Sequence, residues 1–338
     1  MDRIDNKYGI HLTCNTWNHR NADSQITSRH ATENKVIAQM KIFFYDHSTL
    51  QLPQGHHFPS QKYSMLLDEI RNQKILGEHE LIQSIPATRD EVIVAHTKEY
   101  FDGIITGTID PKIMRQIGLP WSKDLVERSL ASVGGSLCAA NEALVSGFSG
   151  NLGGGTHHAM ADQGMGYCVF NDLAVVILNF LRLKKILRTA IIDLDVHQGN
   201  GNAAILGSHP EVFTFSMQGQ KNYPYRKVPS TLDINLPDDT GDKAYLEHLI
   251  TVLPKVFDFN PDIIFYLAGV DPLKEDRLGR LSLTMSGLGE RDWLVLEQCQ
   301  RHSIPVCLVM GGGYAVPIEL TVQAHVQTYK IAKEVYQN

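Results

Sequence analysis

The stretch that decides the fold is IIDLDVHQGNG, residues 191–201. An apolar run passes here directly into the pattern Asp-x-Asp-x-His, formed by Asp193, Asp195 and His197. Side chains two residues apart in a strand point to the same face, so an extended conformation as far as His197 would bring the three together. Carboxylates and an imidazole placed in this way are candidate ligands of a transition metal. The alternative from this segment alone is that they cap the helix that follows.

Short β-branched runs alternate with amphipathic stretches on both sides of this segment. We predict strands at residues 41–45, 91–95, 151–152, 189–194, 212–216, 262–268 and 305–310. We predict helices at residues 61–76, 125–146, 173–185, 243–257, 290–302 and 318–335. This alternation is typical of a mostly parallel sheet with helices on both faces. It predicts a single α/β domain over residues 40–338, and the polar residues 1–39 are expected to be an N-terminal extension outside that domain.

Composition narrows the possible partners. The 338 residues carry a formal net charge of -6, which gives no electrostatic footprint for nucleic acid or anionic lipid. The five cysteines contain no Cys-x-x-Cys pair and favour a reduced, cytoplasmic compartment. No apolar run approaches the roughly 18 residues of a membrane span, so we expect neither membrane insertion nor secretion.

A third metal ligand is available at the end of another apolar run. The segment LAGVD, residues 267–271, ends in Asp271, and a further carboxylate follows at Asp276. Taken in isolation, this pair would more simply cap a turn. Together with Asp195 and His197, however, Asp271 would complete a set of two carboxylates and one imidazole. Such a set neutralises a divalent cation and leaves an open coordination position, which is typical of catalytic sites.

Two glycine-rich segments contain candidate catalytic groups. GGGTHH, residues 153–158, places His157 and His158 after a flexible turn, which favours acid–base groups over the ordinary surface or core histidines. MGGGY, residues 310–314, ends in Tyr314, which could stabilise an oxyanion or simply anchor a tight turn. In a parallel sheet the carboxyl ends of the strands share one edge, so we expect all these segments to form one site.

In this order, GGGTHHA, GYCVFND, IIDLDVHQGNG, AGVDPLKEDRLG and GGGY resemble the histone deacetylase family, including its acetoin-utilisation-like and acetylpolyamine amidohydrolase branches. The resemblance runs from about Lys41 to the C-terminus. It implies an arginase-like fold with an eight-stranded parallel sheet, and a zinc ion held by the residues matching Asp195, His197 and Asp271. Fe²⁺ or Co²⁺ would also suit these ligands.

The resemblance also assigns roles to other residues. It implies that His158 is the general base, that His157 is an electrostatic helper bonded to Asp193, and that Tyr314 binds the substrate carbonyl. The matching substrate channel is lined by Gly166, Tyr167, Tyr223 and Leu278. A potassium or similar cation would be bound by backbone oxygens of Asp193, Asp195, His197 and Met217 and by the hydroxyl of Ser216, although the serine could equally be an ordinary strand residue.

Two departures from the commoner family pattern bear on the substrate. Gln198 and Asn200 stand where many members have His and Asp, a pattern similar to the class IV branch, whose members favour long acyl chains. Asn200 would then orient His158 without a negative charge. The position matching the acidic gatekeeper of polyamine deacetylases is Leu278, which favours an acyl-lysine in a protein or peptide over a polyamine.

Three alternatives remain beside a zinc-dependent acyl-lysine deacylase. One is a deacetylase of a small acetylated amine such as an acetylpolyamine. Another is a ureohydrolase with two manganese ions, but Gln198-Gly199 replaces the carboxylate that would bridge a second metal. The third is a non-catalytic acyl-lysine binding module, which would have lost a ligand or the base. The oligomeric state and the physiological substrate stay open.

Overall fold

A computed structural model describes residues 40–45 and 50–337. The predicted extension, residues 1–39, lies outside the described residues. The strands are β1 (Lys41–Phe44), β2 (Leu81–Gln83), β3 (Phe148–Asn151), β4 (Thr189–Asp193), β5 (Val212–Gly219), β6 (Leu232–Leu236), β7 (Ile263–Leu267) and β8 (Val306–Val309). They form one eight-stranded sheet in the order β2-β1-β3-β8-β7-β4-β5-β6, in which every neighbouring pair is parallel. The predicted fold class is confirmed.

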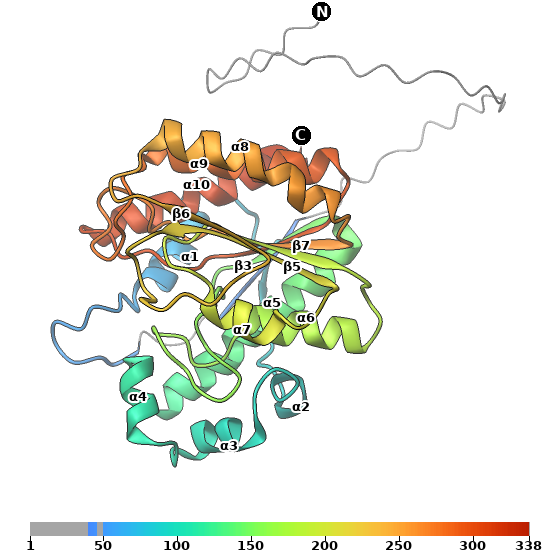
Figure 1. Ribbon diagram of the computed structural model, residues 1–338. Helices are drawn as coiled ribbons and strands as arrows, with labels where there is room; N and C mark the ends of the chain where they lie inside the picture. The colour runs from blue at the N-terminus through green and yellow to red at the C-terminus, as the bar shows by residue number, and fades with distance from the viewer. Residues whose placement is uncertain (1–39, 46–49, 338) are drawn as a thin grey trace, which may run out of the picture. The chain divides into compact units, whose positions relative to one another are not determined.

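Helices cover both faces of the sheet (Figure 1). They are α1 (Lys62–Asn72), α2 (Arg89–Val92), α3 (Lys98–Thr106), α4 (Pro111–Ile117), α5 (Lys123–Ser146), α6 (Asp172–Arg182), α7 (Asn200–Leu206), α8 (Asp242–Asp258), α9 (Met285–Arg301) and α10 (Ile318–Gln337). Helices α8, α9 and α10 lie on one face, and α5, α6 and α7 lie on the other.

The central strands read as continuous apolar runs because both of their faces are buried. In β4, Ala190 and Ile192 pack into the core beneath α8–α10, whereas Ile191 packs into the core beneath α5 and α6. Period-two alternation therefore divides the strand between two cores. No helix of the described residues is both long and apolar enough to cross a bilayer.

The structure corrects several predicted elements. The strand predicted at residues 91–95 is wrong: this segment belongs to helix α2 and the turn after it, and Thr88 and Glu91 form a reciprocal capping box at the start of α2. The strand predicted at residues 151–152 is β3, which begins three residues earlier at Phe148. The edge strands β2 and β6 and the short helices α3, α4 and α7 were not predicted, because short and partly exposed elements carry little periodicity.

Candidate active site

The residues after β4 are gathered by local hydrogen bonds and not by an extended strand. Strand β4 ends at Asp193, so the assumption that the strand continues to His197 is wrong. Instead, the backbone N–H of Asp195 donates to the Asp193 carboxylate at 3.2 Å, and that of His197 donates to the Asp195 carboxylate at 2.9 Å. These side chain-to-backbone bonds turn the chain so that all three side chains are buried at the carboxyl edge of the sheet.

Asp195, His197 and Asp271 form a compact buried cluster. One potential ligand atom from each residue lies within 4.8 Å of the others. Nδ1 of His197 is 3.0 Å from an oxygen of Asp195 and 3.1 Å from an oxygen of Asp271. Burial and the nearby Asp195 carboxylate raise the pKa of Asp271 to about 7. Burial opposes ionisation of His197, but its two carboxylate partners raise its pKa to about 10.

This electrostatic arrangement fits a divalent cation. Two carboxylates buried side by side repel each other, and a proton on His197 is their positive partner within the cluster. A cation between them would neutralise both carboxylates and bind Nδ1 of the neutral imidazole, and these are the donors that zinc prefers. The ligand set predicted from sequence is thus brought together in one place.

The glycines after β8 allow the backbone of this turn to approach the cluster closely. The backbone N–H of Gly312 donates to the Asp195 carboxylate at 2.6 Å. A Cβ atom at Gly312 would overlap the Asp271 carboxylate, so only glycine fits there. The same turn directs Tyr314 into the site, where Asp276 accepts a hydrogen bond from the Tyr314 backbone N–H. Burial raises the pKa of the Tyr314 phenol well above its usual value, which keeps the hydroxyl protonated as a donor.

The tandem histidines have different partners. Nδ1 of His157 donates to the Asp193 carboxylate at 2.7 Å, whereas Nδ1 of His158 donates to the amide oxygen of Asn200, also at 2.7 Å. Burial disfavours a charge on His157, but Asp193 and Asp195 raise its pKa to about 9. Burial, reinforced by the positive charges of His157 and His197, lowers the pKa of His158 well below the usual value. His157 is therefore suited to carry a charge and His158 to stay neutral.

Asn200 does not cap helix α7. It is the first residue of that helix, the residue before it is Gly199, and the N-terminus has no side-chain cap. The Asn200 amide oxygen faces His158, and its nitrogen faces the sulfur of Met165 at 3.4 Å. Because Nδ1 of His158 donates to Asn200, Nε2 is left as the ring nitrogen that can accept a proton.

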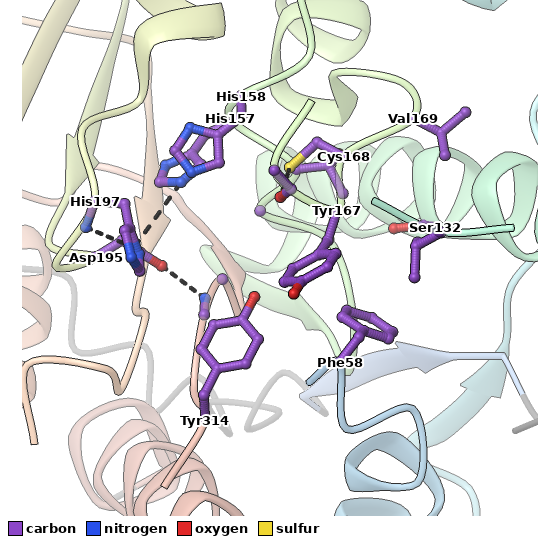
Figure 2. A pocket seen from close by; sticks show the side chains of 18 of the residues that line it. Phe58, Ser132, His157, His158, Tyr167, Cys168, Val169, Asp195, His197 and Tyr314 are labelled. Carbon is purple, nitrogen blue, oxygen red and sulfur yellow. Dashed lines mark hydrogen bonds and ion pairs between the residues drawn. The ribbon is translucent and has the colours of Figure 1, made fainter. Parts of the chain in front are cut away.

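A cavity of about 760 Å³ connects these groups. His157, His158, Asp195, His197 and Tyr314 line it, and the Tyr314 hydroxyl points into it opposite the histidine and carboxylate cluster (Figure 2). The residues predicted to line a substrate channel border the same cavity: Gly166, Tyr167, Tyr223 and Leu278. The ring of Tyr223 meets His158 edge-on at 4.9 Å.

The residues matched to a monovalent-cation site also lie together. Ser216 pairs with Asp193 across β5 and β4, and Met217 follows it in β5. Ser216 is buried, and its hydroxyl has no hydrogen-bond partner among the described residues. An orphaned buried hydroxyl is costly, and a cation would satisfy it.

Several supporting residues were missed from sequence. Asp172 accepts hydrogen bonds from the backbone of Gly155 and Thr156, and so fixes the turn before the histidines. The guanidinium of Arg291 is fully buried and donates to Gly269 O at 2.6 Å and to Leu194 O at 3.3 Å. Leu194 directly follows β4, and Gly269 lies two residues after the neighbouring strand β7. Asp172 is the last residue of the GYCVFND motif, so the sequence offered a signal for it, whereas Arg291 lies in an ordinary helix and the sequence offered none.

The histone deacetylase domain family matches residues 56–329 of this chain. The chain belongs to the histone deacetylase family. It is therefore an amide hydrolase of the deacetylase type. The resemblance drawn from the five ordered motifs is confirmed, and the match covers the elements that carry the cluster, the histidine pair and Tyr314.

Related proteins span most of this family member's length. An uncharacterised protein of Picosynechococcus is 39% identical over 289 residues, which are 84% of this chain and 95% of that protein. Histone deacetylase 2 of Arabidopsis thaliana is 28% identical and covers 90% of this chain and 84% of its own length. A crystal structure of an HDAC homolog complexed with SAHA has a TM-score of 0.76 at 24% identity and covers 88% of both chains, which shows the shared fold.

Proposed function

We propose that this family member hydrolyses the amide bond of an acyl-lysine in a protein or peptide, giving a carboxylate and a free amine. The observation that carries the proposal is the convergence of three elements on one cavity: the Asp195–His197–Asp271 cluster, the neutral histidine His158 and the Tyr314 hydroxyl.

We propose zinc as the metal that Asp195, His197 and Asp271 would hold, although Fe²⁺ or Co²⁺ would suit the same donors. A divalent ion there would supply Lewis-acid chemistry, polarising the amide carbonyl and acidifying water. A potassium or similar cation, bound beside Ser216 and by backbone oxygens of Asp193, Asp195, His197 and Met217, would stabilise the loop after β4.

The protein's own groups would handle the protons. Nε2 of His158 would accept a proton from the attacking water and deliver it to the leaving nitrogen as the C–N bond breaks. His157, charged through its contact with Asp193, would stabilise the negative charge that develops beside it. The Tyr314 hydroxyl would donate a hydrogen bond to the carbonyl oxygen, as oxyanion-stabilising donors do.

The entrance favours a neutral alkyl stem. Tyr167, Tyr223 and Leu278 border the cavity near Gly166, so apolar and aromatic surfaces would enclose the methylene chain of a lysine. A polyamine carries further positive charges, and the apolar Leu278 offers no carboxylate for them. Some relatives of similar identity, such as the acetoin utilization protein AcuC of Staphylococcus aureus at 29%, carry another name, so the substrate must be tested directly.

The test is a panel of lysine peptides carrying acetyl, octanoyl and myristoyl groups, assayed beside acetylated polyamines with and without a chelator. We expect chelator-sensitive turnover of at least one acyl-lysine peptide. Turnover of polyamines alone would favour the small-amine alternative, and tight peptide binding without turnover in the metal-loaded protein would favour a binding module.

A further inference from the structure

The cavity that contains Tyr314, Tyr223 and Leu278 is also lined by a second group of residues, which come from other elements. We call this part of the cavity the inner chamber and define it by six residues from the end of β1, the loop before α1, α1 itself and α5: Phe44, Phe58, Tyr63, Leu67, Arg128 and Ser132. Figure 2 shows Phe58 and Ser132 beyond Tyr167 as seen from the histidine cluster. A continuous series of ring contacts leads there: Tyr314 to Tyr167 at 6.0 Å and Tyr167 to Phe58 at 5.2 Å between centroids.

Arg128 supplies a charge to this chamber without an acidic partner. Its guanidinium carbon lies 4.0 Å from the centre of the Tyr63 ring and 5.3 Å from that of Phe58. Within residues 40–45 and 50–337, no carboxylate forms an ion pair with Arg128, and its side chain makes no hydrogen bond. By contrast, Arg89 and Arg280 pair with Asp102 and Asp238 at about 3 Å.

The chamber holds further unused polar groups. Tyr63 and Ser132 line it, and their hydroxyls make no hydrogen bond to another protein group within the described residues. A second basic side chain, Lys62, is already engaged: its amino group donates to the backbone oxygens of Gly311 and Gly313 at 3.4 Å and lies 5.2 Å from the same Tyr63 ring. A guanidinium is always charged and has five N–H donors. Next to two hydroxyls without protein partners, it is suited to bind a carboxylate group of a ligand.

On the proposed function, the acyl group of the substrate would lie in this chamber. The scissile carbonyl must lie between Tyr314 and the Asp195–His197–Asp271 cluster, and the amine stem would lie toward Tyr223 and Leu278. The remainder of the acyl group then extends toward Phe58 and Arg128. A long hydrocarbon chain would have to remove water from a guanidinium without replacing its hydrogen bonds, which is costly.

We propose that Arg128 is a specificity-determining residue for acyl groups that end in a carboxylate, such as succinyl or glutaryl. This inference rests on the proposed function. The guanidinium binds the terminal carboxylate through paired hydrogen bonds, with Tyr63 and Ser132 as further donors. Water adds to the amide carbonyl, the C–N bond breaks, the leaving nitrogen takes a proton, and the products are a dicarboxylate and a free lysine.

The test compares acyl-lysine peptides matched in chain length. We compare kcat/KM for succinyl with butyryl and for glutaryl with pentanoyl, using metal-loaded full-length enzyme. We expect the carboxylated acyl group to be preferred at one length or both. Arg128→Gln should lower kcat/KM for the preferred carboxylated peptide about ten- to hundred-fold, the range for lost charge-assisted hydrogen bonds. The same variant should change acetyl-lysine turnover less than about threefold.

Two further variants separate recognition from stability. Arg128→Lys keeps the charge and should recover part of the lost activity. Lys123→Gln removes an exposed positive charge from the same helix, outside the cavity, and should leave the ratio of carboxylated to neutral substrates unchanged.

The outcomes distinguish this inference from the proposed function. Turnover of acetyl or butyryl peptides with no turnover of succinyl or glutaryl peptides overturns the inference and leaves the proposed function standing. An unchanged succinyl-to-butyryl and glutaryl-to-pentanoyl ratio in a folded Arg128→Gln variant overturns it as well. If no acyl-lysine peptide reacts, the proposed function itself fails.

Discussion

For Asn200→Asp, the geometry predicts both the direction and the magnitude of the change in the pKa of His158. The change preserves shape but places a carboxylate where an amide oxygen now lies 2.7 Å from Nδ1 of His158. With charge centres about 4 Å apart and an effective dielectric constant of about 20, the attraction is about 4 kcal/mol, or about three pKa units. Desolvation of the new buried carboxylate reduces this gain. We therefore expect the pKa of His158 to rise by about one to two units.

The direction of the expected change in activity follows from the role proposed for His158. A general base must be unprotonated to accept the proton of water, so raising its pKa removes activity on the acidic side. The acidic limb of the kcat/KM profile should move to higher pH by about one to two units, and activity at mildly acidic pH should drop about ten- to hundred-fold. The measurement is kcat/KM for one acyl-lysine peptide across the pH range in which both proteins remain folded.

A neutral control makes this test discriminating. Asn200→Ala removes a hydrogen bond that raises the pKa of His158, so its acidic limb should stay or move down, even if its rate falls. A limb in the Asn200→Asp variant that stays in place or moves down would refute the reasoning, because the structure leaves Asn200 no helix-capping role to explain its presence.

Three other substitutions test the rest of the site. Asp271→Ala should lower bound metal and activity together while circular dichroism shows an intact fold, and a variant with stoichiometric zinc and normal turnover would contradict the ligand set. Tyr314→Phe should reduce kcat about a hundred- to thousand-fold with little change in KM, measured by steady-state kinetics. Ser216→Ala should weaken the dependence of thermal stability on potassium concentration, and equal potassium dependence in both proteins would argue against a cation at the serine.

The sequence was most informative in residues 191–201, because this segment contains both part of a core strand and candidate site residues. The apolar run of β4 and the Asp-x-Asp-x-His pattern after it predicted a buried parallel strand with a polar edge, and the structure contains both. The grouping of the side chains was predicted for the wrong reason, since hydrogen bonds from the backbone of Asp195 and His197 do what a longer strand was expected to do.

What could not be predicted depends on contacts between distant segments. The β-branched residues at 91–95 read as a strand, but the capping box at Thr88 and packing against the rest of the domain produce a helix. The inner chamber combines Phe58 and Tyr63 with Arg128, which come from segments more than 60 residues apart and contain no shared motif. Only the folded chain shows that Arg128 faces a cavity continuous with the catalytic groups.

The two histidines differ in their hydrogen-bond partners, since His157 contacts the Asp193 carboxylate and His158 contacts the Asn200 amide. This difference determines which of the two rings is protonated. Their ring centres are 4.1 Å apart, so a charge on one disfavours a charge on the other. With Asp193 beside His157 and Asn200 beside His158, a proton is favoured on His157, and His158 stays neutral, as its proposed role of general base requires. Two carboxylate partners would divide the protons less sharply between the rings. Because the Asn200 amide is uncharged, it does not favour protonation of His158. We therefore expect His158, and not His157, to be free to accept the proton of the attacking water.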